Sequence, residues 1–404
     1  MRSHDVLSLL LGLLSGSCAA PAQEATRPGV DVLLTDSLHL VRDRRVGLLT
    51  NQTGVDRTGQ DDLTRLRDAG VAVAALFSPE HGFRGALDME NIGHGVDSAT
   101  GLPVFSLYGA VREPTPDMLA RIDVLLVDLQ DIGSRTYTYV STALLALGAA
   151  ARAGVPVVVL DRPNPIGGLM QGPVLDPAYA TPSAGLLPVP LRHGMTIGEL
   201  VRLGNDTLQL GGRLTVVPVA GWTRDRWFDA TGLPWVRPSP NMPDLESATH
   251  YPGIVLFEAT NLSVGRGTPI AFQVIGAPWL DATSLAAAVA DEPGVAVTDT
   301  VIAPRSPTDG KYDGQTLAAV RFRVTDRTRY HPVRLAVRLA AEIRTRQGDS
   351  LRVNARRFDQ LAGTDALRRD VMAGQPVAAI LASWAGQLAA FQAVRARYGL
   401  YDSP

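Results

Sequence analysis

The sequence predicts an α/β fold in which a parallel sheet is covered by helices on both faces, followed by a smaller α+β domain. Four continuous apolar runs lie at residues 46–50, 71–77, 124–128 and 155–160, and helix-like stretches lie between them at 60–69 and 138–153. Unbroken apolar runs are typical of parallel strands that are buried on both faces. Polar residues follow each run, so we expect four loops at one edge of the sheet, where ligands bind in open α/β folds.

The chain is long enough for two domains. Its 404 residues exceed what one hydrophobic core usually supports, which is about 250–300 residues. We expect domains over residues 30–244 and 245–404, joined by the proline-rich segment RPSPNMP at 237–243. The second domain should contain a strand at 317–324, a helix at 331–345 and a final helix at 376–398. The final helix carries an apolar stripe that we expect to be core: Val377, Ile380, Leu381, Trp384, Leu388 and Phe391.

Residues 1–22 have the pattern of an export signal. Arg2 precedes an apolar run at 6–14, which is too short to cross a bilayer, and small residues follow. Cys18 is the only cysteine and lies where a bacterial lipoprotein acceptor would lie, although ordinary cleavage after Ala20 or Ala22 fits equally well. We therefore expect an exported protein of the periplasm or cell envelope, attached to the membrane only if Cys18 carries a lipid.

Charge and motif content exclude several classes of partner. The net charge is −2 with both signs interspersed, so nucleic acid is not an expected partner. The histidines show no paired spacing that is typical of a metal site. Gly265 and Gly267 form a G-x-G, but Pro269 follows where a dinucleotide-binding helix should begin. We expect no cofactor and no metal.

The first charged segment is LFSPEHGFRG at 76–85. Pro79 ends the preceding strand because it cannot donate a ladder hydrogen bond. Glu80, His81 and Arg84 therefore lie in a loop at the carboxyl end of a strand, which makes them candidates for catalysis and ligand binding.

A second candidate loop, DLQDIGSRTYTY, spans 128–139. Asp131 and Arg135 are candidates for chemistry and binding there, or for an ion pair that braces the loop. Tyr137 offers a ring face and a hydroxyl group, which suit sugar binding. Asn51 and Asn164 follow two other strands as binding candidates, although asparagine also forms caps and turns.

His193 precedes a helix that should begin at the N-cap Thr196, with Glu199 completing a capping box. It could meet a ligand, and an exposed turn histidine without a function is the alternative.

A third charged segment, FEATNLSVGRGT, spans 257–268. Glu258 is a candidate acid, and Asn261, Ser263 and Arg266 are candidate binding residues. The alternative is a glycine-rich turn whose polar side chains bond their own backbone. The stretch NLSVG also resembles a nucleophile elbow that lacks its first glycine, so a serine esterase or amidase using Ser263 is the second enzyme hypothesis.

Seven segments in order, GLLTNQTGVD, LFSPEHGFRG, DLQDIGSRTYTY, DRPNPIGG, PLRHGMTIGEL, RPSPNMP and LFEATNLSVGRGTP, resemble the bacterial exo-β-N-acetylmuramidase family NamZ. The resemblance runs from about Gly29 to the C-terminus, and Ala259 departs from it where glycine is expected. It implies a Rossmann-like N-terminal domain without nucleotide, a smaller C-terminal domain and an active site in the cleft between them. The implied reaction releases terminal β-1,4-linked N-acetylmuramic acid from the non-reducing end of peptidoglycan fragments, with Glu80 as the catalytic residue.

Glycoside cleavage usually requires two carboxyl groups on opposite sides of the bond. We assign Glu80 as general acid and either Glu258 or Asp131 as its partner. An arginine is expected to bind the lactyl carboxylate of muramic acid. A muropeptide-binding protein without turnover is the non-enzymatic alternative. The candidate substrate-binding residues are Asn51, His81, Arg84, Arg135, Tyr137, Asn164, His193, Asn241, Asn261, Ser263 and Arg266.

Overall fold

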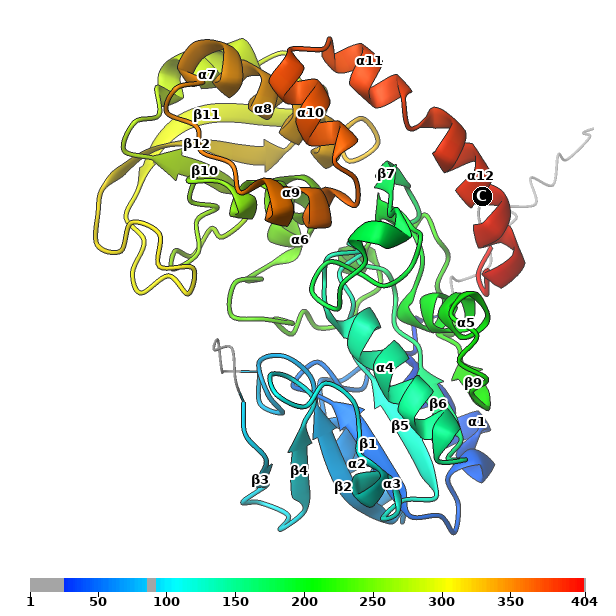
Figure 1. Ribbon diagram of the computed structural model, residues 1–404. Coiled ribbons are helices and arrows are strands. Elements are labelled where there is room, and N and C mark those ends of the chain that lie inside the picture. The colour runs from blue at the N-terminus through cyan, green and yellow to red at the C-terminus, as the bar shows by residue number, and fades with distance from the viewer. Residues whose placement is uncertain (1–24, 86–91, 403–404) are drawn as a thin grey trace, which may run out of the picture.

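The chain folds into two lobes (Figure 1), shown by a computed structural model that describes residues 25–85 and 92–402. The expected export signal at 1–22, with Cys18, lies outside the described residues. The N-terminal lobe, blue to green in Figure 1, holds the larger sheet, and the second lobe holds a smaller sheet and its helices. The last helices, in red, run from the second lobe back to the first.

The larger sheet confirms the predicted parallel α/β fold. Its strand order is β3-β4-β2-β1-β5-β6-β9, and β3 alone pairs antiparallel within it. Leaving β3 aside, the order of the remaining strands along the chain is the 3-2-1-4-5-6 of Rossmann folds. The strands are β1 (Val46–Thr50), β2 (Val73–Ser78), β3 (Gly95–Val96), β4 (Pro103–Ser106), β5 (Val124–Asp128), β6 (Val157–Leu160) and β9 (Leu214–Val217).

Both faces of this sheet are buried because alternate strand residues point to opposite sides. In β5, Val124 and Leu126 join a core with helices α1 (Gly29–Asp36) and α2 (Asp62–Asp68). Leu125 and Val127 join the other core, formed with α3 (Pro116–Leu119), α4 (Tyr139–Arg152) and α5 (Ile197–Thr207). The predicted capping box before α5 is confirmed, since Thr196 Oγ1 accepts from the Glu199 N–H and Glu199 Oε2 accepts from the Thr196 N–H.

Side chains fill the crevice where a Rossmann fold usually binds a nucleotide. The strand order reverses between β1 and β5, and ligands enter such sheets at this point. Here the segment 228–236 lies over the loops that follow β1, β5 and β6, leaving a volume of only about 10 Å³. That volume holds about one water molecule. A nucleotide does not fit there in this structure.

The second lobe is built on an antiparallel sheet with the order β10-β12-β11, and α6 packs against α8 beside it. The expected strand 317–324 and helix 331–345 are confirmed by β12 and α8. The elements are α6 (Leu245–Ile254), β10 (Val274–Ala277), α7 (Ala282–Ala288), β11 (Val295–Ile302), β12 (Leu317–Val324), α8 (Pro332–Gln347), α9 (Ala355–Ala362) and α10 (Ala366–Ala373). The small sheet β7 (Gln171–Val174) and β8 (Pro190–Arg192), and the short 3-10 helices η1 (Leu38–Leu40), η2 (Pro177–Tyr179), η3 (Phe228–Ala230) and η4 (Val255–Ala259), complete the fold.

The expected final helix is broken into α11 (Val377–Ala382) and α12 (Ala385–Tyr398). Taken as one segment, Val377–Tyr398 is long and apolar enough to cross a membrane by length and composition. In the structure, however, Ile380, Trp384 and Phe391 from the predicted stripe are buried in the main core. The two helices therefore cover the globular fold as surface helices, with α12 lying against α5 and β7.

The C-terminal residues are fixed to the N-terminal lobe. Leu400 N–H donates to Glu199 Oε1 over 2.7 Å, and the Tyr401 hydroxyl donates to Asp161 Oδ2 over 2.5 Å. The chain thus joins its lobes twice, once before α6 and again through α12.

Candidate active site

A pocket of about 380 Å³ is lined by residues of both lobes. The sequence-predicted residues Glu80, His81, Tyr137, Glu258 and Arg266 line it together. The carboxyl ends of β2 and β5 deliver the first three, and the second lobe delivers the other two. The remaining lining residues are Tyr108, Thr136, Thr138, Ser183, Ser239, Tyr251, Phe272, Thr308, Asp309 and Arg357.

Glu80 is held at the N-terminus of α4. The chain turns sharply after β2 because His81 and Gly82 adopt left-handed backbone angles, with φ of 71° and 76°. Such angles are uncommon for a residue with a side chain and cluster at functional sites. Thr138 Oγ1 donates to Glu80 Oε2 over 2.6 Å. In the described part of the chain, no arginine or lysine lies within ion-pair distance of Glu80.

Glu258 differs from Glu80 because it forms an ion pair. It lies in η4, and its Oε1 is 2.8 Å from Arg266 Nε and 2.6 Å from Arg266 Nη2. The Arg266 guanidinium also lies over the ring of Phe272, 5.2 Å from its centroid. Lys311 Nζ donates to the backbone carbonyls of Glu258 and Leu262, over 3.0 Å each, which fixes this turn. Glu258 is thus a carboxylate with a dedicated cationic partner.

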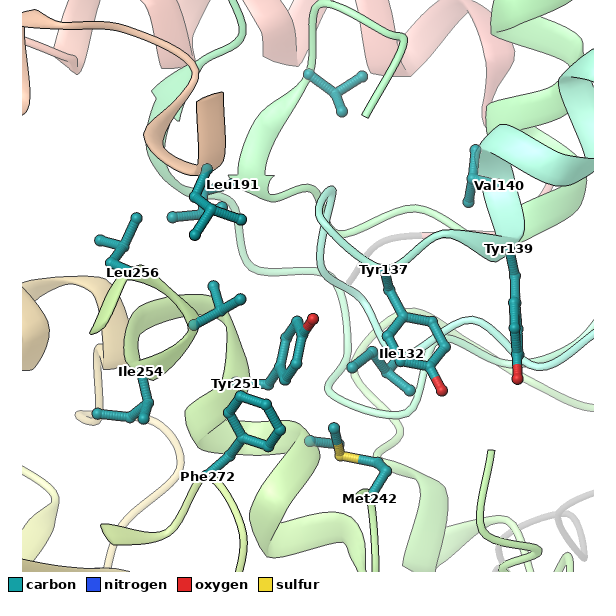
Figure 2. Close-up of a cluster of buried hydrophobic side chains, with 14 of the residues drawn as sticks. Ile132, Tyr137, Tyr139, Val140, Leu191, Met242, Tyr251, Ile254, Leu256 and Phe272 are labelled. Carbon is teal, nitrogen blue, oxygen red and sulfur yellow. The ribbon is translucent and has the colours of Figure 1, made fainter. Parts of the chain in front are cut away.

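Aromatic rings form a wall of the pocket (Figure 2). The rings of Tyr137 and Tyr251 meet edge to face with their centroids 5.9 Å apart, and the ring centroids of Tyr251 and Phe272 are 4.6 Å apart. The ring of Tyr139 packs edge to face against that of Tyr137, with the two centroids 4.8 Å apart. Burial raises the pKa of the two lining tyrosines, Tyr137 and Tyr251, and keeps their hydroxyl groups protonated. The wall therefore combines ring faces and edges with neutral hydroxyl groups, a surface suited to a sugar.

Asp131 does not reach the pocket. The turn at Gly133, where φ is 86°, brings the Gly133 N–H within 2.6 Å of Asp131 Oδ2. The same oxygen lies 3.2 Å from His193 Nε2, and both side chains are buried. His193 Nδ1 accepts from the Met195 N–H, so this histidine braces two loops and is not an exposed turn residue. The structure gives no support to Asp131 as the partner of Glu80 or to His193 as a binding residue.

Two of the arginines expected to bind a carboxylate are engaged elsewhere. Arg135 is buried and donates to four backbone carbonyls, those of Pro173, Ala184, Val189 and Leu361. It therefore joins the lobes through α9, and no ion pair with Asp131 forms. Arg84 is 65% exposed and pairs with Asp97 at 2.6 Å, outside the pocket lining.

The predicted asparagines bond protein groups: Asn51 and Asn164 form local turns as the alternative expected, whereas Asn261 braces a distant segment of the chain. Asn164 bonds the Met195 carbonyl and the Ile166 N–H, and Asn261 bonds the Ser350 carbonyl and the Arg352 N–H. Asn51 accepts from Thr53 and donates to the Tyr139 hydroxyl over 2.8 Å, so it supports the aromatic wall from behind. Asn241 is buried and is not part of the pocket lining.

Ser263 is 1% exposed, and its hydroxyl accepts a hydrogen bond from the Gly265 N–H. It lies in an antiparallel bridge with Gly276, where no histidine contacts it within the described chain. The elbow-like stretch is a structural turn, which removes the support for a serine esterase.

Several pocket residues carry no chemical signal of their own in the sequence, although Thr138 and Ser239 lie within the segments DLQDIGSRTYTY and RPSPNMP. Thr138, Ser183, Ser239 and Tyr251 lie in ordinary turns or helices. The loop at 303–316 reaches the rim of the pocket through Thr308 and Asp309, and the Tyr312 hydroxyl donates to the Asn261 carbonyl. Among residues 25–85 and 92–402, His, Cys, Asp and Glu form no group of three or more that could hold a metal ion.

Comparison with known proteins agrees with this architecture. The models of exo-beta-N-acetylmuramidase NamZ match residues 46–246 with the N-terminal part and 249–401 with the C-terminal part. Peptidoglycan beta-N-acetylmuramidase NamZ of Bacillus subtilis (strain 168) is 39% identical, over 97% of this chain and 97% of the relative.

Two crystal structures of DUF1343 family proteins from Bacteroides fragilis NCTC 9343 resemble the whole chain. One has a TM-score of 0.86 at 32% identity, covering 94% of this chain and 99% of the other. The second has a TM-score of 0.75 at 30% identity, covering 94% and 100%. Since the family models and these relatives span nearly all of the sequence, the chain belongs to the NamZ family of exo-β-N-acetylmuramidases.

Proposed function

We propose that this protein is an exo-acting glycoside hydrolase that releases terminal β-1,4-linked N-acetylmuramic acid from the non-reducing end of peptidoglycan fragments. The observation that carries the proposal is the single pocket in which Glu80 and Glu258 come from different lobes. Two carboxyl groups around one bond are the usual requirement for glycoside hydrolysis. Within the family, this chemistry serves the turnover of the cell wall.

The two carboxyl groups have different surroundings, which supports different roles. Glu258 pairs with Arg266 and acts as the ionised group, which stabilises positive charge on the sugar or activates the nucleophile. Among the described residues, the hydrogen-bond donor to the Glu80 carboxyl is the neutral hydroxyl of Thr138. Glu80 acts as the general acid on the leaving oxygen. Thr138 orients Glu80 toward that oxygen. Asp131, which lies outside the pocket, takes no part.

The pocket also suits the sugar in size and lining. Its volume of about 380 Å³ falls within the range of about 300–1,000 Å³ that is usual for small-molecule sites. Tyr251 and Phe272 supply apolar surface. Ser183 and Ser239 supply hydroxyl groups from the other lobe. A sugar ring needs both kinds of contact.

Export is part of the proposal, because peptidoglycan lies outside the cytoplasm. The charged start, short apolar run and small residues of 1–22 support an export signal. Cys18 is the position at which a lipid anchor would attach.

Defined disaccharides test the function. The wild-type protein should release N-acetylmuramic acid from a disaccharide in which this sugar is the non-reducing residue. It should leave the reversed disaccharide, with N-acetylglucosamine at that end, intact. Binding of the first disaccharide without any release would favour the non-catalytic muropeptide-binding protein, and removal of acyl groups with the glycosidic bond intact would favour an esterase.

A further inference from the structure

The pocket contains an arginine that has no carboxylate partner among the residues the structure describes. Arg357 lies in the first turn of α9 and lines the pocket. Its Nη1 donates to Ser183 Oγ over 3.2 Å. Among the described residues, no Asp or Glu lies within ion-pair distance of its guanidinium, whereas Arg266 is neutralised by Glu258.

The other cations are less suited to binding an anionic ligand in this pocket. Lys311 Nζ bonds two backbone carbonyls and lies 3.8 Å from Asp309. Arg135 is buried among carbonyl groups, and Arg84 pairs with Asp97. Neither of these two arginines lines the pocket. Arg357 is thus the lining cation with hydrogen-bonding capacity to spare.

Arg357 is also held in a defined position. Its backbone N–H donates to the N-cap side chain of Asn354 over 3.1 Å. The next residue, Phe358, is buried in the main core and anchors the first turn of α9. Ser183 lies in the N-terminal lobe, between η2 and β8, so its hydrogen bond with Arg357 spans the two lobes.

The substrate supplies a group that fits this arginine. N-acetylmuramic acid differs from N-acetylglucosamine by a lactyl ether that ends in a carboxylate. A guanidinium has five N–H donors, so after one bond to Ser183 it can still hold a carboxylate through two parallel bonds. We propose that Arg357 binds the lactyl carboxylate and thereby selects N-acetylmuramic acid over N-acetylglucosamine. This inference rests on the proposed function and replaces the arginines expected from the sequence.

The test compares Arg357→Gln and Arg357→Lys with wild type on three nitrophenyl glycosides: the β-N-acetylmuramide, its lactyl methyl ester and the β-N-acetylglucosaminide. Arg357→Gln should lower kcat/KM on the free-acid muramide by about 10- to 150-fold, the range for a charge-assisted hydrogen bond. It should change kcat/KM on the two neutral substrates by less than about threefold, within the spread of a near-neutral change. Arg357→Lys should retain part of the preference because it keeps the charge and loses the fork.

Arg356→Gln is the matched control. Arg356 precedes Arg357 on α9 and is exposed, so its replacement should leave all three rates unchanged. Equal losses by Arg357→Gln on the acid and the ester, or no loss on either, would overturn the inference.

Calorimetric titration with N-acetylmuramic acid and its methyl ester gives a readout that does not need turnover. Weaker binding of the acid alone by Arg357→Gln supports the inference, and equal binding of the acid by wild type and variant overturns it. An inactive wild type would instead count against the proposed hydrolase, so the two failures are distinguishable. Circular dichroism and a urea midpoint confirm that each variant is folded before either result is used.

Discussion

Replacing Arg135 with methionine distinguishes a structural arginine from a ligand-binding one. The guanidinium donates to four backbone carbonyls at 2.8–3.3 Å, and each bond from a charged donor contributes about 2 kcal/mol. Burial opposes this by lowering the pKa of Arg135 to about 9, which corresponds to a cost of about 5 kcal/mol for burying the charge. The difference predicts that Arg135→Met lowers the free energy of unfolding by about 3 kcal/mol.

Urea denaturation followed by tryptophan fluorescence measures this change, with Arg356→Met as the exposed control, expected within about 0.5 kcal/mol of wild type. Because Arg135 donates to the Leu361 carbonyl in the second lobe, we also expect the two lobes of the variant to unfold in separate transitions. The folded variant should keep its KM. A KM raised at least tenfold with an unchanged urea midpoint would refute the structural role and return Arg135 to the substrate.

Three further changes test separate parts of the account. Glu258→Gln should lower kcat at least about a hundredfold in steady-state assays; a rise in KM alone would make Glu258 only a binding residue. Ser263→Ala should leave muramide hydrolysis intact and cost about 1 kcal/mol in urea denaturation, whereas complete loss of activity would restore the serine-nucleophile hypothesis. Burial raises the pKa of Asp161 to about 6, so the folded state binds an extra proton between about pH 4 and 6 and loses stability as the pH rises through that window. Asp161→Asn removes the titrating group and with it this loss. The free energy of unfolding of the variant minus that of wild type should therefore increase by up to about 3 kcal/mol from pH 4 to pH 7. A difference that does not change with pH would contradict the burial of a titrating carboxyl group.

The sheet and one side of the pocket could be predicted because their causes are local. An unbroken apolar run specifies a strand buried on both faces, and Pro79 ends β2 at the position that exposes Glu80. The capping box at Thr196 and Glu199 involves residues only three apart. Glu258 could be predicted because a carboxylate next to glycines and an arginine is stable only if a cation pairs with it. Arg266 is that cation.

The misplaced residues depend on contacts between distant parts of the chain. Arg135 donates to backbone carbonyls that lie 38 to 226 positions away along the chain, and Leu361 is the most distant of them. The backbone turn at Gly133 directs Asp131 toward His193 and away from the pocket. Such outcomes follow from the packing of lobes and loops, which residue types and spacing do not specify.

Arg357 is a pocket residue that the sequence did not indicate. It lies in a helix without a polar motif, in a region whose sequence indicates only structure. Its relation to Ser183 arises when the second lobe docks on the first. The role of such a residue depends on its tertiary contacts in the pocket, which the local sequence does not specify.

The most direct measurement of the central claim, that Glu80 donates the proton to the leaving oxygen, is the activity of Glu80→Gln on two substrates of different leaving group. Release of muramic acid from the disaccharide needs that proton, so the variant should lose at least about a hundredfold in rate. Dinitrophenolate leaves a dinitrophenyl β-N-acetylmuramide without being protonated, so hydrolysis of this substrate should fall far less. Equal losses on both substrates, or near-native turnover of the disaccharide by a folded variant, would contradict the assignment.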